Sequence, residues 1–175
     1  MKILFYSHTG QVSGAENILL LLLKYLNREK FTPIAVCPEG GLAEEIGKLG
    51  IPVKIVRQLE ARFTWRIDLI FKYLISLFST IKQLRSEILE VKPDLIHANS
   101  IRAGLTANLA SVGTGLPVFW HIQDELKLHP FSIAIRLLVA ASSRTRLISV
   151  SQATADSFRG RILQWFGKHV PERIV

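Results

Sequence analysis

The sequence has almost no cysteine, since Cys37 is the only one among 175 residues. A single thiol excludes a disulfide within the chain and any zinc site built from several cysteines. Cysteine usage this sparse fits a reducing compartment, so we expect a cytoplasmic protein.

Long apolar runs are also missing. The short apolar segment after Lys2 soon gives way to glycines, without the long apolar core and cleavage site of a signal peptide. The most apolar stretch, residues 63–81, is interrupted by Arg66, Asp68 and Lys72. This stretch is therefore a poor transmembrane span.

Acidic residues are fewer than basic ones, 14 against 22, so the formal net charge is +8 at pH 7. An excess of positive charge favours a polyanionic partner, and nucleic acid, an acidic membrane surface and phosphorylated ligands all fit. The basic residues are scattered, and no aromatic and basic motif of a known nucleic-acid reader occurs. The sequence therefore argues against nucleic acid and leaves the other two partners open.

The order of apolar segments predicts an α/β fold. Residues 3–5 form a continuous apolar run, typical of a central strand that is buried on both faces of a parallel sheet. Strand and helix patterns alternate from there, which implies right-handed crossovers and a doubly wound, mostly parallel sheet in a Rossmann-like three-layer sandwich. We expect a single domain over residues 1–175. Further strands are expected at residues 31–37, 51–56, 94–97, 117–121 and 147–150, and helices at residues 14–27, 42–49, 65–91, 103–111, 131–141 and 151–166.

The loop after the first strand carries small residues where the chain must turn into a helix. Gly10 and Gly14 permit the turn and let another molecule approach the main chain closely. Ser13 fits the N-cap position, and Glu16, three residues later, completes the spacing of a capping box. The helix N-terminus would then face the mouth of the sheet as an anion site. An ordinary strand-to-helix turn with a good cap explains the same residues.

Polar residues follow several of the expected strands. In a doubly wound sheet a ligand binds beyond the strand ends where the strand order reverses, here between the first and fourth strands. Residues 8–16 and 98–104 would form the two sides of such a cleft, and residues 121–126 would look into it. The side chains with suitable chemistry are His8, His97, Asn99, Ser100, Arg102, His121 and Asp124.

The three histidines at strand ends raise the possibility of zinc. No spacing fixes a common ligand geometry, so no metal is expected. The simpler interpretation places His97 in the core and exposes His121 to substrate. Asp124 would then orient His121 or serve as a local loop cap.

The remaining polar residues leave two interpretations open. Asn99, Ser100 and Arg102 offer the donors that a carbohydrate or phosphate needs, but Asn99 or Ser100 is also a standard helix cap. Gly10 and Gly14 are spaced wrongly for G-x-G-x-x-G, so a dinucleotide cofactor is not expected.

Taken together, these segments resemble the N-terminal half of a GT-B glycosyltransferase of the large retaining family 4. The resemblance covers essentially the whole chain and implies a nucleotide-sugar as co-substrate, with no other cofactor. It also implies that an acceptor hydroxyl displaces the nucleoside diphosphate with retention of the anomeric configuration. The matching segments are the loop Ser13-Gly14-Ala15-Glu16, the strand end Asp94-Leu-Ile-His-Ala-Asn-Ser100, the acceptor-side His121, and Val150-Ser151 with the helix that follows.

The resemblance also implies roles for these residues. The loop of residues 13–16 would lie near the donor diphosphate and the acceptor, and His121, the catalytic residue, would contact the transferred sugar. Two positions depart from the family pattern: Ser13 replaces the first glycine, and Asn99 stands where a second histidine is common, which leaves the acceptor undefined. The residues implied to bind a carbohydrate or lipid-linked acceptor are His8, Asn99, Ser100, Arg102 and Asp124.

A second domain is part of the family pattern. It holds most of the nucleotide-sugar, with an E-x7-E-type segment and basic residues that stabilise the departing diphosphate. Residues 173–175 look like the start of a connecting strand, so we expect a domain whose C-terminal donor-binding partner is absent and which does not turn over alone. The alternative is a stand-alone Rossmann-like binding module for a phosphorylated metabolite or an acidic partner.

Residues 57–92 combine a long helical pattern with positive charge. A basic helix with surplus apolar side chains can lie on an anionic bilayer, as family members with lipid-linked acceptors often do. The protein would then be peripheral on the inner face of the membrane. Packing of the surplus side chains on the sheet or on the missing domain is the competing explanation. The main apolar stripe comprises Ile67, Ile70, Phe71, Leu74, Leu77, Phe78, Ile81, Leu84 and Ile88, and the surplus comprises Trp65, Leu69, Tyr73 and Ile75.

Overall fold

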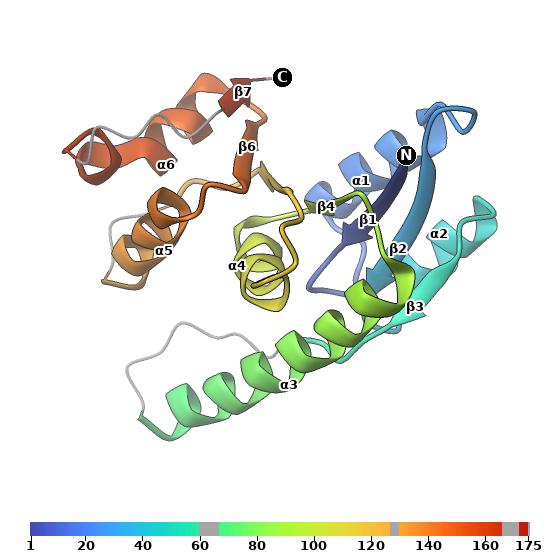
Figure 1. The fold of residues 1–175 in the computed structure, drawn as a ribbon, viewed down its shortest axis with the longest axis horizontal. Coiled ribbons are helices and arrows are strands. Elements are labelled where there is room, and N and C mark those ends of the chain that lie inside the picture. Colours follow the sequence, from blue (N-terminus) through green and yellow to red (C-terminus); the bar gives the residue numbers. More distant parts are fainter. Residues whose placement is uncertain (60–66, 127–129, 166–171, 175) are drawn as a thin grey trace.

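The computed structural model describes residues 1–59, 67–126, 130–165 and 172–174. Its strands form one parallel sheet in the order β3-β2-β1-β4-β5-β6-β7 (Figure 1). The order reverses between β1 and β4, which confirms the predicted doubly wound fold. The strands are β1 (Lys2–Tyr6), β2 (Thr32–Cys37), β3 (Val53–Ile55), β4 (Leu95–Ala98), β5 (Val118–Ile122), β6 (Thr145–Ser149) and β7 (Glu172–Ile174).

Six helices connect these strands in the described part of the chain. The ends of the elements expected from the sequence differ from the observed ends by at most two residues. β7 adds a seventh strand, which pairs with β6 where the sequence showed only the start of a connecting strand. The helices are α1 (Gly14–Tyr25), α2 (Gly41–Lys48), α3 (Ile67–Val91), α4 (Ile101–Ala110), α5 (Pro130–Ala141) and α6 (Gln152–Trp165).

The central strand β1 is buried on both faces, as its apolar run predicts. Successive side chains of a strand point to opposite faces. Ile3 and Phe5 therefore pack with α1 and α2, while Leu4 and Tyr6 belong to the core beneath α3 and α4. Figure 1 shows α3 and α4 on the side of the sheet opposite α1.

The two halves of α3 have different surroundings. Leu84 and Ile88, in the C-terminal half, are buried in the core. Leu74 and Phe78 lie on the same predicted stripe, but 49% and 72% of their surfaces are exposed. In Figure 1 the N-terminal half of α3 extends beyond α4, and these two side chains are left uncovered. The side chains of residues 65–73 are outside the described part, and they include Ile67, Ile70 and Phe71 of the stripe and Trp65, Leu69 and Tyr73 of the surplus.

Cys37, at the end of β2, has almost no exposed surface. Burial raises the pKa of its thiol to about 11. A thiol that is both enclosed and protonated is chemically inert. Among the described helices, none combines the length and apolarity that crossing a membrane requires.

Candidate functional site

The loop between β1 and α1 ends at Ser13, the N-cap residue of α1. The Ser13 hydroxyl makes no hydrogen bond to the helix backbone and instead donates to the Glu16 carboxylate. The Ser7 hydroxyl lies 3.5 Å from the other oxygen of that carboxylate. Glu16 is only 2% exposed, and a buried carboxylate needs hydrogen-bond donors. Ser13 and Glu16 therefore occupy the predicted capping-box positions, but the Ser13 hydroxyl bonds to the Glu16 side chain and not to the helix backbone.

Gly10 and Gly14, in the same loop, meet different surroundings. A Cβ added to Gly10 would lie 2.3 Å from the carbonyl oxygen of Glu39, whereas one added to Gly14 would meet nothing within 4 Å. The Leu42 N–H also donates to the Gly10 carbonyl at 2.9 Å, so this loop packs directly on the loop between β2 and α2. The fold thus needs Gly10, while Gly14 leaves open space beside N–H groups that lack partners within the helix.

Asn99, the residue after β4, connects the loop to the neighbouring strands. Its side-chain nitrogen donates to the Ala15 carbonyl at 3.1 Å, and its side-chain oxygen accepts from Gln123 Nε2 at 3.1 Å. The Asn99 backbone N–H donates to the Tyr6 carbonyl at 2.9 Å. Only 1% of Asn99 is exposed. Because both ends of its amide are used, Asn99 fixes the start of α1 relative to the end of β5.

Ser100 is the N-cap of α4, and its hydroxyl accepts from the Ala103 N–H at 3.0 Å. The same hydroxyl lies 3.1 Å from Nδ1 of His8, which follows β1. Burial lowers the pKa of His8 to about 4; the positive charge of Arg102 adds to this effect and the negative charge of Asp124 opposes it. His8 is therefore neutral at pH 7 and can both donate and accept a hydrogen bond.

His121, in β5, lies inside the sheet edge. It is 7% exposed, as is His97, so the expected burial of His97 is confirmed and the expected exposure of His121 is wrong. The two rings meet edge to face with centroids 5.4 Å apart. Gln123 Nε2 lies 3.4 Å from Nδ1 of His121. Asp124, which the sequence placed beside His121, acts electrostatically on His8.

Both buried histidines of this pair are uncharged at neutral pH. Burial, together with the nearby His121, lowers the pKa of His97 to about 3, and burial also lowers the pKa of His121. Within the described residues, His97 Nε2 has no hydrogen-bond partner, and no group of three His, Cys, Asp or Glu side chains lies close enough to hold a metal ion.

Gln123 is a site residue that the sequence patterns did not reveal. The signal was present, because residues two apart in an extended chain share one face, which places Gln123 beside His121. We call the joined side chains the polar edge. The polar edge comprises His8, Asn99, Ser100, His121 and Gln123, from the ends of β1, β4 and β5.

Doubly wound sheets bind ligands where the strand order reverses, and the polar edge lies at that point. Comparison with known families identifies the family to which the chain belongs. The sequence model of Glycosyltransferase Family 4 matches residues 12–164. The chain belongs to this family. Family membership supports a glycosyltransferase function. No match is found among curated proteins.

Several solved structures share the fold of this Glycosyltransferase Family 4 chain. HepE of Anabaena in complex with UDP-glucose has 24% sequence identity and a TM-score of 0.70, with 100% of this chain and 43% of HepE covered. MurG of Acinetobacter baumannii has 13% identity and a TM-score of 0.65, with 99% and 44% covered. A glycosyltransferase from Rickettsia africae has 15% identity and a TM-score of 0.62, with 86% and 37% covered. These likenesses show a Rossmann-like α/β fold that matches part of each GT-B structure, and the chain spans less than half the length of each.

Proposed function

We propose that this chain is the acceptor-side domain of a retaining glycosyltransferase, which moves a sugar from a nucleotide-sugar to an acceptor hydroxyl. The observation that carries the proposal is the bridge made by Asn99 between Ala15 and Gln123. This bridge gathers the start of α1, the end of β4 and the end of β5 into one preformed edge. A transfer reaction that depends on positioning requires polar groups that are in place before the substrate binds.

The donor diphosphate would bind beside the loop of residues 13–16. The N-terminus of α1 carries partial positive charge and unpaired N–H groups, which attract phosphate. Gly14 leaves open space at that point, so a phosphate can approach the backbone. HepE has been crystallised with UDP and with UDP-glucose, which favours a uridine nucleotide as the donor for this chain as well.

His121 would contact the transferred sugar as the catalytic residue. Its lowered pKa keeps the imidazole neutral at pH 7, so it can donate a hydrogen bond without carrying a charge. Gln123 lies against Nδ1 and would hold the ring in one orientation. A group fixed in this way holds the transferred sugar in the orientation needed as its bond to the diphosphate breaks.

The acceptor would bind on the other side of the polar edge, against His8, Asn99, Ser100, Arg102 and Asp124. In the transfer step the acceptor oxygen bonds to the anomeric carbon, and the bond from that carbon to the diphosphate oxygen breaks. The proton of the acceptor hydroxyl passes to the departing diphosphate. The nucleotide itself would be held mainly by a C-terminal domain of the complete protein.

The product of the complete reading frame tests this proposal. We expect acceptor-dependent release of UDP from a UDP-sugar, and an NMR spectrum of the product that retains the anomeric configuration of the donor. Inversion of that configuration would contradict the retaining mechanism. Tight binding of a phosphorylated metabolite to residues 1–175, with no transfer to any acceptor, would instead support the stand-alone binding module.

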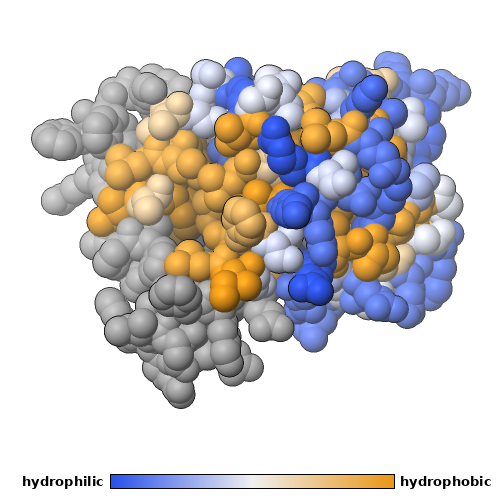
Figure 2. Space-filling view, turned by 60° about the horizontal axis from the view of Figure 1, so that its bottom comes forward, coloured by the Kyte–Doolittle hydropathy of each residue, from blue (hydrophilic) through white to orange (hydrophobic). Residues whose placement is uncertain are grey.

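A peripheral position on an anionic membrane is a second part of the proposal. Figure 2 shows a continuous apolar area on the face that carries α3. On α3, Leu74, Ile75 and Phe78 are 49%, 66% and 72% exposed. We call these three residues the apolar patch. Exposed apolar side chains on the helix of a positively charged chain suit the surface of an anionic bilayer.

Co-sedimentation with vesicles of phosphatidylglycerol and phosphatidylcholine tests the membrane proposal. We expect the unaltered chain to pellet with the vesicles and the double variant Ile75→Glu/Phe78→Glu to stay in the supernatant. Leu21→Glu, at a site on α1 that is 54% exposed, is the matched control and should pellet normally. Equal pelleting of all three proteins, or of none, would remove the membrane from the proposal.

A further inference from the structure

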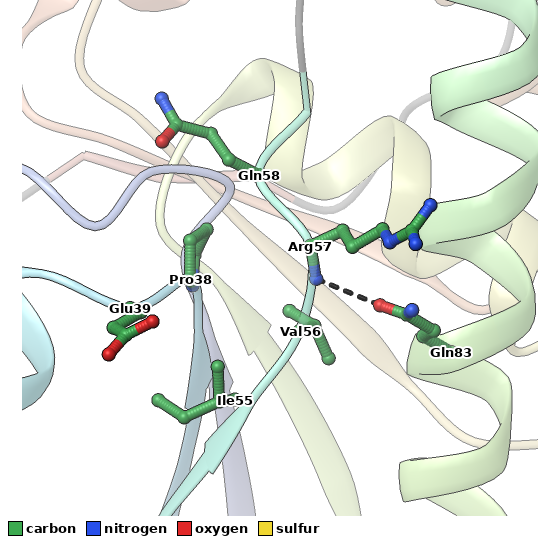
Figure 3. A pocket seen from close by; sticks show the side chains of 7 residues that line it. All are labelled: Pro38, Glu39, Ile55, Val56, Arg57, Gln58 and Gln83. Atoms are coloured by element: carbon green, nitrogen blue, oxygen red, sulfur yellow. Dashed lines mark hydrogen bonds between the residues drawn. The ribbon is translucent and has the colours of Figure 1, made fainter.

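A pocket of about 370 Å³ opens where β2 and β3 end, away from the polar edge (Figure 3). Residues after both strands form its walls, and α3 closes it on one side. In Figure 3, Glu39 and Gln58 lie on the same side of the chain leaving β3 as Ile55, while Arg57 extends towards α3. The lining residues are Pro38, Glu39, Ile55, Val56, Arg57, Gln58 and Gln83.

The lining combines aliphatic surface with groups that recognise hydroxyls. Ile55 is 54% exposed, so an aliphatic face stands open to the pocket. Gln58 brings an amide with two donors and one acceptor, and Glu39 brings acceptor oxygens. A sugar ring presents C–H faces and hydroxyl edges and matches such a lining. A free anion matches it less well, because the Glu39 carboxylate would repel it while the Arg57 side chain extends towards α3.

The walls of the pocket are held before any ligand arrives. The Arg57 backbone N–H donates to Gln83 Oε1 at 2.8 Å, and the Val56 N–H donates to the Cys37 carbonyl at 3.1 Å. Lys54, in β3, pairs with Glu90 of α3 at 2.6 Å. Because these bonds fix β3 against both β2 and α3, a ligand would lose little free energy in ordering the site.

The pocket is connected to the proposed donor loop through the backbone. Gly10, in the loop before α1, packs against Glu39, which is a pocket residue. Neighbouring strands are about 5 Å apart, so β3 lies about 10 Å from β1 across the sheet. A single sugar at the polar edge does not span that separation, but a longer acceptor does.

We infer that this pocket binds a neutral sugar ring of the acceptor, remote from the hydroxyl that receives the transferred sugar. The inference rests on the proposed glycosyltransferase function, and it deepens that function by naming a saccharide as the acceptor class. Ile55 and Gln58 would then set acceptor preference without taking part in the chemistry. Their contribution would appear in acceptor affinity and leave the bond-breaking step unchanged.

Titration of the 15N-labelled chain with maltose, cellobiose and lactose, followed by two-dimensional NMR, tests the pocket directly. We expect at least one disaccharide to shift the backbone amides of residues 55–58 and of Glu39. Ile55→Ser and Gln58→Ala should each weaken that binding at least fivefold. The matched controls are Leu21→Ser on α1, as exposed as Ile55, and Gln152→Ala on α6, and both should bind normally.

Three results would overturn the inference. They are the absence of any shift at the pocket with all three disaccharides, equal weakening in the control variants, and displacement of the bound disaccharide by inorganic phosphate. The last result would make the pocket an anion site. Thermal melting of each variant establishes that it is folded, so a loss of binding cannot be a loss of structure.

A transfer assay on the complete protein separates this inference from the proposed function. Saccharide binding at the pocket without transfer of any sugar would leave the pocket in place and contradict the proposed function. The opposite result is normal transfer with no saccharide bound at the pocket and no change in acceptor KM in Ile55→Ser. That result would support the proposed function and contradict the inference about the pocket. If both hold, Ile55→Ser and Gln58→Ala should raise the acceptor KM and leave kcat unchanged.

Discussion

The polar edge and the apolar patch are two surfaces of opposite chemistry. At the polar edge, His121 and Asn99 are buried, and the amides of Asn99 and Gln123 hold neighbouring elements in place. At the patch, Ile75 and Phe78 extend from a helix whose other half supplies the core. The first surface is organised before a ligand binds, whereas the second gains only when another apolar surface covers it.

This difference indicates how each surface responds to mutation. A residue of the polar edge is held by several neighbours, so its loss disturbs chemistry, local order or both. A residue of the apolar patch has few neighbours within the chain, so its loss is silent until a partner is present. The following experiments test that contrast, from the largest expected effect to the smallest.

His121→Ala should have the largest effect, because it removes the proposed contact to the transferred sugar. In the complete protein we expect turnover to fall by about 100-fold or more, a typical effect of losing a positioned catalytic group. The melting temperature should change little in comparison. Tyr25→Ala, which removes a ring that is 76% exposed on α1, is the control and should leave turnover unchanged. Near-normal activity of His121→Ala would remove this residue from the mechanism.

Leu84→Ala and Leu74→Ala separate the two halves of α3. Leu84 is fully buried, so its truncation should lower the free energy of unfolding by about 2–5 kcal/mol. Leu74 is half exposed, so the same substitution there should change it by less than about 1 kcal/mol. Urea denaturation measures both values. Equal losses would mean that the N-terminal half of α3 is covered in solution.

Acid should weaken the fold through the histidines of the strand ends. His8 and His97 have folded-state pKa values of about 4 and about 3, below the ordinary 6.5. Between those values and 6.5 the unfolded chain binds more protons, so stability is complete above pH 6.5 and falls as the pH decreases. We expect each of the two histidines to contribute a loss of about 3 kcal/mol by pH 4. His97→Leu should flatten this pH dependence, and an unchanged slope would show that another group controls it.

Gly10→Ala and Gly14→Ala compare two positions of one loop. The new Cβ at Gly10 would collide with the backbone of Glu39, so we expect a loss of about 1–3 kcal/mol in the free energy of unfolding. Gly14 faces open space, so its substitution should change stability by less than about 0.5 kcal/mol. Gly14→Ala should instead weaken the binding of UDP to the complete protein. Calorimetric titration measures that affinity, and an unchanged value would place the diphosphate elsewhere.

The strand order and the residues at the strand ends could be predicted because they depend on local patterns. The apolar run of β1 and the small residues after it determine that the chain crosses the sheet and turns into α1. Several contacts could not be predicted, because they join distant segments. The Ser13 hydroxyl turns to Glu16 because that carboxylate is buried, and the burial of His121 depends on packing across several strands.

The surface of α3 shows a second limit of sequence patterns. Periodicity identified the helix and its apolar stripe, and Leu84 and Ile88 follow the prediction. Periodicity does not show how far the core extends beneath a helix, so it places Leu74 and Phe78 on the same stripe although both are exposed. The pocket beside Gln83 is hidden from sequence patterns for a similar reason, because its walls come from segments 26 residues apart.

The enclosed thiol of Cys37 provides a built-in reporter of opening. A maleimide or disulfide reagent can reach that sulfur only after β2 separates from the layer formed by α1 and α2. The rate of labelling therefore measures how fast β2 separates from α1 and α2, without any engineered probe. Because Cys37 is the one cysteine of the chain, every modified molecule has opened at this place.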